Sequence, residues 1–321
     1  MVYMPKILIG GALHERPVEA DGTFRRMPSS YRHEISKSPD AMFPAAKGRY
    51  HLYLSKACPW CHGVELVISL KGLQETISIT WMDPLSSQDG WVLKKNVAGE
   101  VAGAPQVDFL YQVYQYFAPD YTGPITVPLL IDRDRGQIVS TESAEMMRMF
   151  NSSFNGLGAM GPELYPDELV QEIDRITDMI QAPIREGVYR AGFASSQQAY
   201  CEAVFALFDA LEQVEQVLTS RRFLAGEQIT EVDLKFYPTL VRFDAVYVTH
   251  FKADYKRISD YPALTRYFDE ISALPDVTST IDMPQIREHY FRSHTHINPT
   301  GIIPIGPAHS LVGYSRQGGT V

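Results

Sequence analysis

The sequence predicts an α/β domain followed by an all-α domain. Apolar residues alternate along short segments between residues 50 and 140, which is the periodicity of strands. Between two of these segments the spacing becomes helical, so strand, helix and strand follow one another within about thirty residues. From residue 165 onward the apolar spacing is helical only. We place the boundary between the domains near residues 151–166.

The composition is that of a globular protein, since 45% of the 321 residues are hydrophobic and 11% are aromatic. The formal net charge of −9 offers no basic face for phosphate groups, so nucleic acid is not an expected partner. Three cysteines in a chain of this length do not make a secreted disulfide framework. The first residues make a poor signal peptide, and no segment reaches the ~20 apolar residues of a membrane helix. We therefore expect a cytoplasmic protein that has no membrane partner.

The α/β domain is predicted to begin after an extended arm, residues 1–48, which is rich in Pro, Gly, Ser and charge. The first strand is predicted at Tyr50–Ser55 and the second at residues 77–81. Between them, apolar residues at helical spacing follow Cys58, and Gly72 marks the end of this helix.

The second half of this domain is predicted to follow an insertion at residues 84–120. Two strands at Ile125–Ile131 and Gln137–Ser140 flank a polar, glycine-containing turn that suits a hairpin. A helix is predicted to start near Glu142–Ser143. The order is therefore β-α-β and then β-β-α, and the domain spans residues 49–155.

The all-α domain is predicted over residues 165–297 from four stripes of apolar residues. The stripes contain Leu169, Ile173, Ile176 and Ile180; Ala203, Leu207, Leu211, Val214 and Leu218; the segment after Thr230; and Leu264, Phe268 and Ile271. Ser195 and Thr230 begin capping-box patterns at the second and third helices. Pro238 is expected to interrupt or bend the third helix. The tail, residues 298–321, is too rich in Pro and Gly to be helical and is expected to wrap the outside.

The segment Cys58-Pro-Trp-Cys61 carries the chemistry, because it lies between a strand and a helix. The first amides of a helix have no intrahelical partners and the helix dipole is positive there, so a thiolate is favoured over a thiol. Pro59 fits this position because its missing N–H would be unpaired in any case. A thiolate is the nucleophile of thiol–disulfide exchange, so the segment predicts a redox cysteine at Cys58.

A metal half-site or inert buried cysteines are the alternatives. Zinc would need a second pair of ligands, and Cys201 stands alone in the sequence. His289, His294 and His296 lack the i, i+4 spacing of ligands on one helix, and no acidic partner accompanies them. We therefore predict no metal site.

Two further sites support the redox interpretation. Pro128 after Val127, at the entry to a strand, suggests a cis-proline loop whose exposed backbone pairs with a peptide-like thiol. Its alternative is an ordinary proline on an edge strand. Glu142 and Ser143 at a helix start offer an anion site and a carboxylate for an amine. Their alternative is a simple N-cap.

A set of segments spread from about Phe24 to Pro307 carries a family resemblance. They are residues 49–60, Gly90–Trp91, Thr141–Glu145, Gly187–Tyr200, Phe223–Asp233, Leu240–Asp244, Tyr247–Lys252, Arg257–Tyr261, His289–His294 and Asn298–Pro307. Together with the strand, Cys-Pro-x-x and helix order, they resemble the glutathione transferases. More specifically, they resemble the glutathionyl-hydroquinone reductases, which are the Xi class of these transferases.

The resemblance implies a thioredoxin-like N-terminal domain, an all-α C-terminal domain and a homodimer. It also implies a reductase that removes glutathione from glutathionyl-hydroquinones, with glutathione as co-substrate and no metal. By position Cys58 is the nucleophile, and Tyr189 and Tyr290 bind the phenol oxygens, unless these tyrosines only pack between helices. The residues implied to hold glutathione are Trp91, Val127, Glu142 and Ser143.

The chain departs from the family pattern at two places. After Cys-Pro-Trp the family has Ala and then His-Arg, whereas this chain has Cys61-His-Gly63. The family often has an arginine before the Val-Pro strand, where this chain has Gly123-Pro-Ile125. The loss of two cations leaves open a different low-molecular-weight thiol. Cys61 also creates a Cys-x-x-Cys, so Cys61 is a candidate resolving thiol.

Two other functions remain as alternatives. A dithiol oxidoreductase or glutaredoxin-like deglutathionylase would use Cys58 and Cys61 together. A transferase-fold binding or assembly module would need no chemistry, and the cysteine at a helix start argues against it. The resemblance over the whole chain favours the hydroquinone-reducing enzyme.

Overall fold

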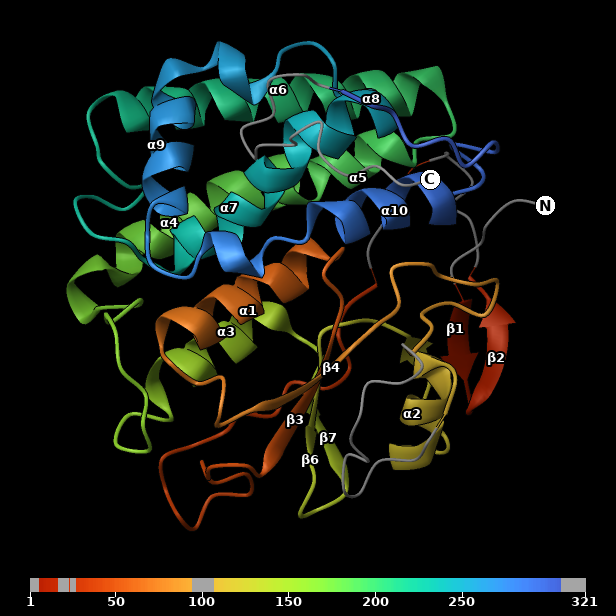
Figure 1. Cartoon of the computed structure of the whole chain (residues 1–321), viewed down its shortest axis with the longest axis vertical. Helices are drawn as coiled ribbons and strands as arrows, with labels where there is room; N and C mark the ends of the chain where they lie inside the picture. The colour runs from red at the N-terminus through yellow and green to blue at the C-terminus, as the bar shows by residue number, and fades with distance from the viewer. Residues whose placement is uncertain (1–5, 17–22, 24–26, 94–106, 307–321) are drawn as a thin grey trace. The chain divides into compact units, whose positions relative to one another are not determined.

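The structure, a computed structural model, describes residues 6–16, 23, 27–93 and 107–306. The chain divides into two compact units (Figure 1). Of the described residues, the first unit contains 6–16, 27–93, 107–168 and 275–281. The second unit contains 23, 169–274 and 282–306.

A four-stranded mixed sheet is the centre of the first unit. Its elements are β3 (Tyr50–Leu54), α1 (Pro59–Leu70), β4 (Ser78–Trp81), β6 (Leu129–Asp132), β7 (Gln137–Ser140) and α3 (Ser143–Ser152). The strand order is β4-β3-β6-β7, with β3 and β4 parallel and the other pairs antiparallel. The helices α1 and α3 contact each other and cover one side of this sheet (Figure 1). The predicted β-α-β and β-β-α order is confirmed.

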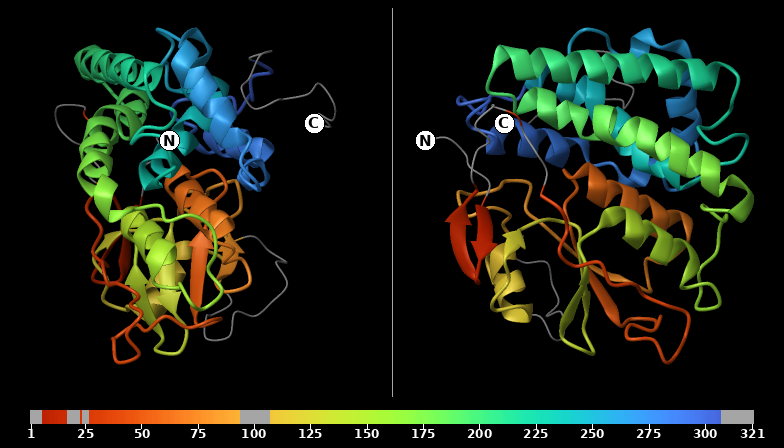
Figure 2. Two further views of the ribbon diagram at one scale, coloured as in Figure 1. Left: turned by 90° about the vertical axis from the view of Figure 1, so that its left-hand side faces the viewer. Right: turned by 180° about the vertical axis from the view of Figure 1, so that it is seen from behind.

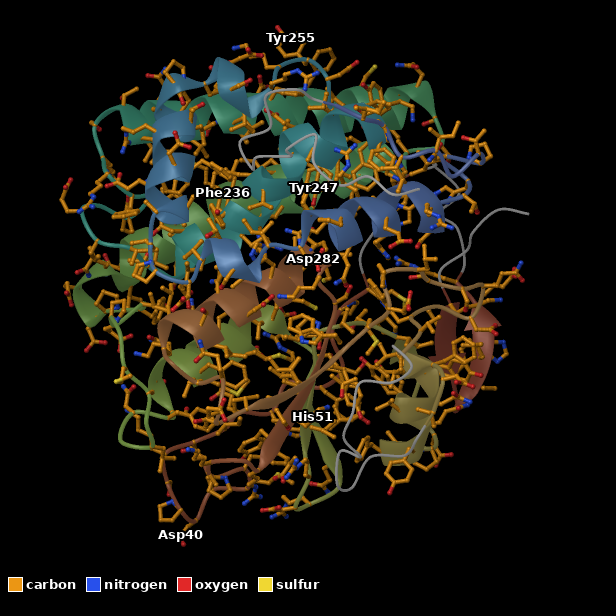
Figure 3. All side chains as sticks on the ribbon, in the orientation of Figure 1. Asp40, His51, Phe236, Tyr247, Tyr255 and Asp282 are labelled. Carbon is orange, nitrogen blue, oxygen red and sulfur yellow. The ribbon has the colours of Figure 1, made fainter. Side chains whose placement is uncertain are left out.

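His51 ties two of these strands together from within β3 (Figure 3). Its Nδ1 lies 2.8 Å from Ser78 Oγ and its Nε2 lies 3.0 Å from Thr80 Oγ1, both on β4. Burial lowers the pKa of His51 to about 3, and the nearby charge of Arg133 adds to the shift. The imidazole is therefore neutral and serves as a structural cross-link.

The N-terminal residues are not simply an extended arm, which corrects the prediction for residues 1–48. The strands β1 (Lys6–Ile9) and β2 (Ala12–Glu15) form a hairpin, and β1 also pairs with β5 (Gly123–Pro124). The turn is Gly10-Gly11, with φ of 53° and 78°. A Cβ on Gly11 would lie 1.9 Å from Pro119 O, so only glycine fits there. Two glycines between apolar runs are a hairpin signal that the compositional argument overlooked.

The predicted insertion and the strand after it also need correction. Helix α2 (Leu110–Phe117) lies inside residues 84–120, of which 94–106 are outside the described part. Its buried residues, Leu110, Val113 and Tyr114, have the i, i+3, i+4 spacing of one helix face, a short signal that the prediction did not use. The strand expected at Ile125–Ile131 begins only at Leu129, because Pro128 has no N–H for the ladder.

The second unit consists of helices. Its α-helices are α4 (Val170–Ile180), α5 (Gly187–Gly192), α6 (Gln197–Thr219), α7 (Glu231–Arg242), α8 (Val248–His250), α9 (Pro262–Ser272) and α10 (Met283–Ser293). Two π-helical segments, Gln181–Arg185 and Phe243–Tyr247, follow α4 and α7. A short 3-10 segment occurs at Ile258–Asp260. Two others occur at Asp167–Leu169, where the first unit ends, and at Thr278–Thr280, which belongs to the first unit. The four apolar stripes are confirmed as α4, α6, α7 and α9, whereas α5, α8 and α10 were not predicted. Helices α5 and α6 run side by side (Figure 2).

Two details of these helices differ from expectation. Helix α6 is capped by Ser196 rather than Ser195, since Ser196 Oγ accepts from the Ala199 amide at 3.2 Å. Helix α7 continues through Pro238 up to Arg242 without interruption. Every residue of α7 is buried, so tertiary packing outweighs the one hydrogen bond that a proline removes.

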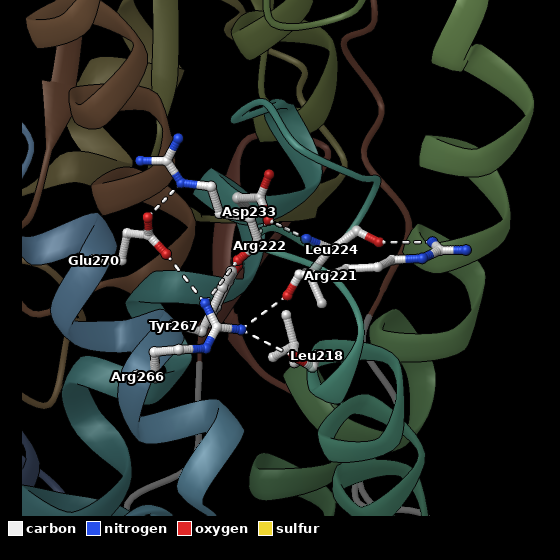
Figure 4. A network of polar contacts seen from close by, with 8 residues as sticks. All are labelled: Leu218, Arg221, Arg222, Leu224, Asp233, Arg266, Tyr267 and Glu270. Carbon is white, nitrogen blue, oxygen red and sulfur yellow. Dashed lines mark hydrogen bonds and ion pairs between the residues drawn. The ribbon is translucent and has the colours of Figure 1, made fainter.

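A network around Asp233 fixes the start of α7, as the capping-box pattern predicted (Figure 4). Asp233 Oδ2 accepts from the Thr230 amide at 2.8 Å, and Oδ1 accepts from the Leu224 amide at 2.9 Å and the Tyr267 hydroxyl at 3.0 Å. Nearby, Arg266 donates to the carbonyl of Leu218, in the last turn of α6, and to that of Arg221, just after α6. Local sequence pattern and long-range contacts therefore agree at this helix start.

The boundary between the units is less simple than the expected single all-α domain at 165–297. Residues 275–281 belong with the first unit, because Thr280 contacts the segment around α1. Thr280 Oγ1 lies 2.7 Å from His62 Nε2, and Thr280 O accepts from Lys56 at 3.3 Å.

In the tail, residues 298–306 form no helix or strand, and Arg287 holds them through the carbonyls of Pro304 and Gly306. The rest of the predicted tail, 307–321, lies outside the described residues.

Candidate active site

Cys58 is the N-cap residue of α1, with φ −78° and ψ 121°, and Pro59 is the first residue of the helix. Its partly exposed side chain therefore lies beside the first amides of α1, where the helix dipole favours a negative charge. The backbone is fixed on both sides of Cys58. Its amide donates to Ser55 O at 3.2 Å, and its carbonyl accepts from the His62 amide at 3.0 Å. This arrangement suits a thiolate nucleophile.

The sheet topology brings further predicted residues to the same edge. The C-terminal ends of β3, β4 and β7 and the N-terminal end of β6 lie together, because β3 is parallel to β4 and β6 is antiparallel to its neighbours. Cys58 follows β3, Val127 precedes β6 and Glu142 follows β7. Three residues predicted from separate motifs therefore meet at one edge of the sheet.

Val127 contacts the cysteine through its backbone carbonyl. Cys58 Sγ lies 3.7 Å from Val127 O, and the peptide bond between Val127 and Pro128 is cis, as the sequence suggested. The structure gives the Val127 N–H no hydrogen-bond acceptor among the described residues. A peptide-like ligand at Cys58 would thus find an available donor beside the sulfur.

Glu142 and Ser143 stand at the beginning of α3. Glu142 is the N-cap, and its carboxylate accepts from the Ala144 amide at 3.5 Å, a long hydrogen bond. The Glu142 amide donates to Ser140 Oγ at 3.0 Å, and Ser143 is buried. The capping role foreseen as an alternative is therefore present. It does not exclude an anion at the helix N-terminus, where the positive dipole remains.

Trp91 lies in residues 84–120, the predicted insertion, and backbone hydrogen bonds fix its position. The Trp91 carbonyl accepts from the Leu110 amide, the first of α2, at 3.0 Å. The neighbouring Val92 carbonyl accepts from the Asp83 amide at 2.9 Å, just after β4. Trp91 is consequently held between the end of β4 and the start of α2, at the same edge of the sheet.

Cys61, the candidate resolving thiol, lies in the first turn of α1 with 1% of its surface exposed. Neither Cys58 nor Cys61 forms a disulfide. The second cysteine of the pair is thus the buried one, and the first is the accessible one. This asymmetry agrees with a nucleophilic role for Cys58.

The tyrosines predicted for the substrate belong to the second unit and meet each other there. The hydroxyl groups of Tyr189, on α5, and Tyr290, on α10, are 2.5 Å apart. Tyr247 joins them, with its hydroxyl 3.3 Å from that of Tyr290. Tyr247 lies in one of the family-like segments of the sequence, but no role was predicted for it. Its place beside Tyr290 follows only from the packing of α10 on Phe243–Tyr247.

Burial keeps Tyr290 protonated. Burial raises the pKa of Tyr290 well above its ordinary value, with the charge of Arg242 acting in the opposite direction. Tyr290 is therefore a phenol at physiological pH and can donate a hydrogen bond. Phe251 packs against all three rings, with its centroid 5.3 Å from that of Tyr189, 5.4 Å from that of Tyr247 and 5.7 Å from that of Tyr290.

The histidines considered as metal ligands lie near these tyrosines in a different arrangement. His250 Nε2 is 3.1 Å from His294 Nδ1, and His296 stacks on Phe193 at 5.5 Å between ring centroids. Within the described ranges, no group of three or more His, Cys, Asp or Glu side chains is placed to hold a metal ion. Likewise, none of the helices described is both long and apolar enough to cross a membrane.

Family models match both units of the chain. The model of the glutathione S-transferase N-terminal domain matches residues 57–153, and that of the C-terminal domain matches residues 197–270. The glutathionyl-hydroquinone reductase YqjG of Escherichia coli is 44% identical over 95% of this chain and 96% of its own. The glutathionyl-hydroquinone reductase PcpF of Sphingobium chlorophenolicum is 43% identical over 92% of this chain and 93% of its own.

Solved structures agree with these sequence matches. The glutathione-bound structure of YqjG has a TM-score of 0.85 at 43% identity and covers 96% of this chain and 97% of that chain. The Xi class transferase from Natrialba magadii has a TM-score of 0.89 at 37% identity and covers 98% of this chain and 96% of that chain. The similarity extends over nearly the whole chain, through both units. The chain belongs to the glutathionyl-hydroquinone reductases, the Xi class of the glutathione transferases.

Proposed function

We propose that the chain is a glutathione-dependent reductase that removes glutathione from glutathionyl-hydroquinones. The observation that carries the proposal is Cys58, which occupies the N-cap position of α1 and has its sulfur 3.7 Å from the Val127 carbonyl oxygen. A thiolate in this position attacks sulfur, whereas a serine or tyrosine there would only activate bound glutathione. The relatives named glutathionyl-hydroquinone reductase support the choice of substrate.

The reaction proceeds in two steps. The Cys58 thiolate attacks the sulfur of the conjugate, a new S–S bond forms, and the bond between this sulfur and the aromatic carbon breaks. The carbon takes up a proton and hydroquinone leaves. A second glutathione thiolate then attacks the mixed disulfide, which releases oxidised glutathione and restores Cys58. Two glutathione sulfurs are oxidised and the aromatic carbon is reduced, so the electrons balance.

The edge of the sheet in the first unit would hold glutathione. The Val127 backbone offers a donor and an acceptor to the peptide part, and the N-terminus of α3 at Ser143 suits a carboxylate. Glu142 would pair with the amine, and Trp91 would cover the ligand. In the second unit, the hydroxyls of Tyr189 and Tyr290 would donate hydrogen bonds to the phenol oxygens, which stabilises the negative charge of the leaving group.

The Cys-x-x-Cys pair supports a variant of this cycle. In it, buried Cys61 attacks the Cys58 mixed disulfide, glutathione leaves, and an internal disulfide forms. External thiol then reduces that disulfide. The same chemistry would serve a dithiol oxidoreductase or a glutaredoxin-like deglutathionylase, which is the second candidate function. The family often has an arginine before the Val-Pro strand, where this chain has Gly123-Pro-Ile125. A thiol other than glutathione is therefore part of this alternative.

A homodimer in the cytoplasm is part of the same proposal. Cys58 and Cys61 form no disulfide, which suits a reducing compartment, and the family resemblance supports the dimer.

Intact-mass measurement tests the proposal directly. The protein is exposed in turn to glutathione disulfide and to the disulfides of other low-molecular-weight thiols, and the adduct on Cys58 is identified. Glutathione should attach, and a glutathionyl-hydroquinone should be reduced, while conjugation of chlorodinitrobenzene stays weak because a cysteine forms disulfides. Rapid conjugation of chlorodinitrobenzene without reductase activity would contradict the proposed reductase function. An adduct formed only with another thiol would favour the second candidate.

A further inference from the structure

Tyr114 holds the backbone immediately before the cysteine's partner. It lies on α2, the helix inside the predicted insertion, and its side chain is completely buried. The Tyr114 hydroxyl donates to Thr126 O at 2.9 Å and accepts from the Thr126 amide at 3.4 Å. One side chain thus binds both backbone polar groups of the residue that precedes Val127.

The first of these hydrogen bonds acts on Val127 itself. The Thr126 carbonyl and the Val127 N–H belong to one planar peptide group, so a bond that fixes the oxygen also fixes the direction of the N–H. This N–H has no acceptor among the described residues. The carbonyl of the same residue faces Cys58 Sγ. Tyr114 therefore orients a free donor that lies next to the reactive sulfur.

The surroundings make Tyr114 a rigid support. Its ring stacks on Tyr121 with centroids 5.0 Å apart, and the Tyr121 hydroxyl donates to Pro124 O at 3.0 Å. At the other end of this short helix, the Leu110 amide donates to the Trp91 carbonyl at 3.0 Å. Burial raises the pKa of Tyr114, so its hydroxyl keeps the proton that it donates. Helix α2 thus connects Trp91 to the loop at Val127.

We propose that Tyr114 is a positioning residue that presents the Val127 backbone to the peptide part of the thiol substrate. This inference rests on the proposed function, since it concerns the glutathione that Cys58 accepts. It predicts a selective defect: loss of the hydroxyl slows the reaction with a disulfide that has peptide groups, and spares the reaction with a disulfide that has none.

The experiment measures the rate at which Cys58 acquires an adduct, by intact mass, from two disulfides. One is glutathione disulfide and the other is bis(2-hydroxyethyl) disulfide. In each case Cys58 thiolate attacks one sulfur, the S–S bond of the reagent breaks, and a thiolate leaves. The variant is Tyr114→Phe in the full chain. The matched control is Tyr50→Phe, because the buried Tyr50 hydroxyl also donates to a backbone carbonyl, Pro44 O at 2.8 Å, in the same unit.

We expect Tyr114→Phe to slow the glutathione reaction about tenfold and the hydroxyethyl reaction less than about twofold, from the loss of one buried hydrogen bond. Tyr50→Phe should change neither rate by more than about twofold. The ratio of the two rates is taken on one sample, so partial unfolding lowers both rates alike and leaves the ratio unchanged. An unchanged ratio in Tyr114→Phe overturns the inference while the proposed function stands. Failure of the unmodified protein to accept glutathione overturns the proposed function as well.

Discussion

The hydroxyl of Tyr189 lies 2.5 Å from the hydroxyl of Tyr290, although 101 positions separate the two residues in the chain. The hydroxyl of Tyr247 is 3.3 Å from that of Tyr290, so three phenols share one network. Tyr290 is the central member, and it is 2% exposed. A pair of hydroxyls so placed can donate to oxygen atoms that acquire negative charge during a reaction.

Replacement of Tyr189 or Tyr290 by Phe should lower turnover of glutathionyl-hydroquinones and leave mixed-disulfide formation at Cys58 intact. A preorganised donor to a developing phenolate stabilises the transition state by about 2–4 kcal/mol, which is roughly a thirty- to thousandfold change in rate. Steady-state kinetics with the conjugate and intact mass with glutathione disulfide separate the two steps. Tyr237→Phe, on α7, is a control, because its hydroxyl bonds Ser272 and lies outside the three-phenol network. If kinetics are unchanged in both active-site variants, the tyrosines are structural.

Cys58→Ser should abolish thiol exchange, whereas Cys61→Ser should leave the hydroquinone reaction largely working. The physical reason is the position of each sulfur, since Cys58 is the partly exposed N-cap residue of α1 and Cys61 is buried within its first turn. If Cys61 resolves the mixed disulfide, its loss should make the glutathione adduct on Cys58 accumulate in a single turnover followed by intact mass. Cys201→Ser, on α6, serves as the control thiol. The reverse pattern, in which only Cys61 is essential, would contradict the mechanism.

Stability should fall as the pH drops below about 6.5, partly because of His250. Burial lowers the pKa of His250 to about 3, with contributions from His296, Lys252 and His289. In the unfolded chain, His250 takes up a proton as the pH falls through the ordinary histidine pKa of 6.5, whereas in the folded chain it stays neutral until the pH approaches 3. The stability contributed by neutral His250 is therefore complete above the ordinary histidine pKa and is lost as the pH falls toward 3.

This effect is measurable by urea unfolding at pH 8 and pH 5. At pH 5 the single group costs the native protein about 2 kcal/mol relative to pH 8. His250→Gln keeps a side chain that can bond His294 but cannot titrate, so its stability should fall by about 2 kcal/mol less over the same interval. His14→Gln, an exposed histidine on β2, should behave as the unmodified protein. Equal pH dependence in all three proteins would show that protonation of His250 does not lower the free energy of unfolding.

Asp233→Asn should destabilise the second unit. Burial raises the pKa of Asp233 to about 6, so at pH 7.5 it is mainly an ionised acceptor that binds two amides and the Tyr267 hydroxyl. An amide nitrogen in place of one oxygen leaves a buried donor facing another donor, which costs about 2–4 kcal/mol. Thermal and urea unfolding at pH 7.5 measure the loss. Asp209→Asn, at an exposed position on α6, should change stability by less than about 0.5 kcal/mol.

The sequence by itself determined the features that depend on neighbouring residues. The start of α1 at Cys58 and Pro59, the β-α-β and β-β-α order, and the capping box at Thr230 all follow from short-range patterns. Such patterns act through hydrogen bonds and side-chain directions within one or two turns, so they can be read without the fold. Whole-chain resemblance added the roles implied for Trp91 and Tyr189.

Only the tertiary structure decided the features that join distant segments. The hairpin at Lys6–Glu15 pairs with Gly123–Pro124, Thr280 joins the first unit, and Tyr247 meets Tyr290. The clearest case is Tyr114, whose helix was read as an insertion without a role, yet its hydroxyl binds the backbone beside Val127. The periodicity of a segment indicates which face is buried, but not which partner covers it. That choice depends on the packing of the whole core, in which Tyr114 is completely buried.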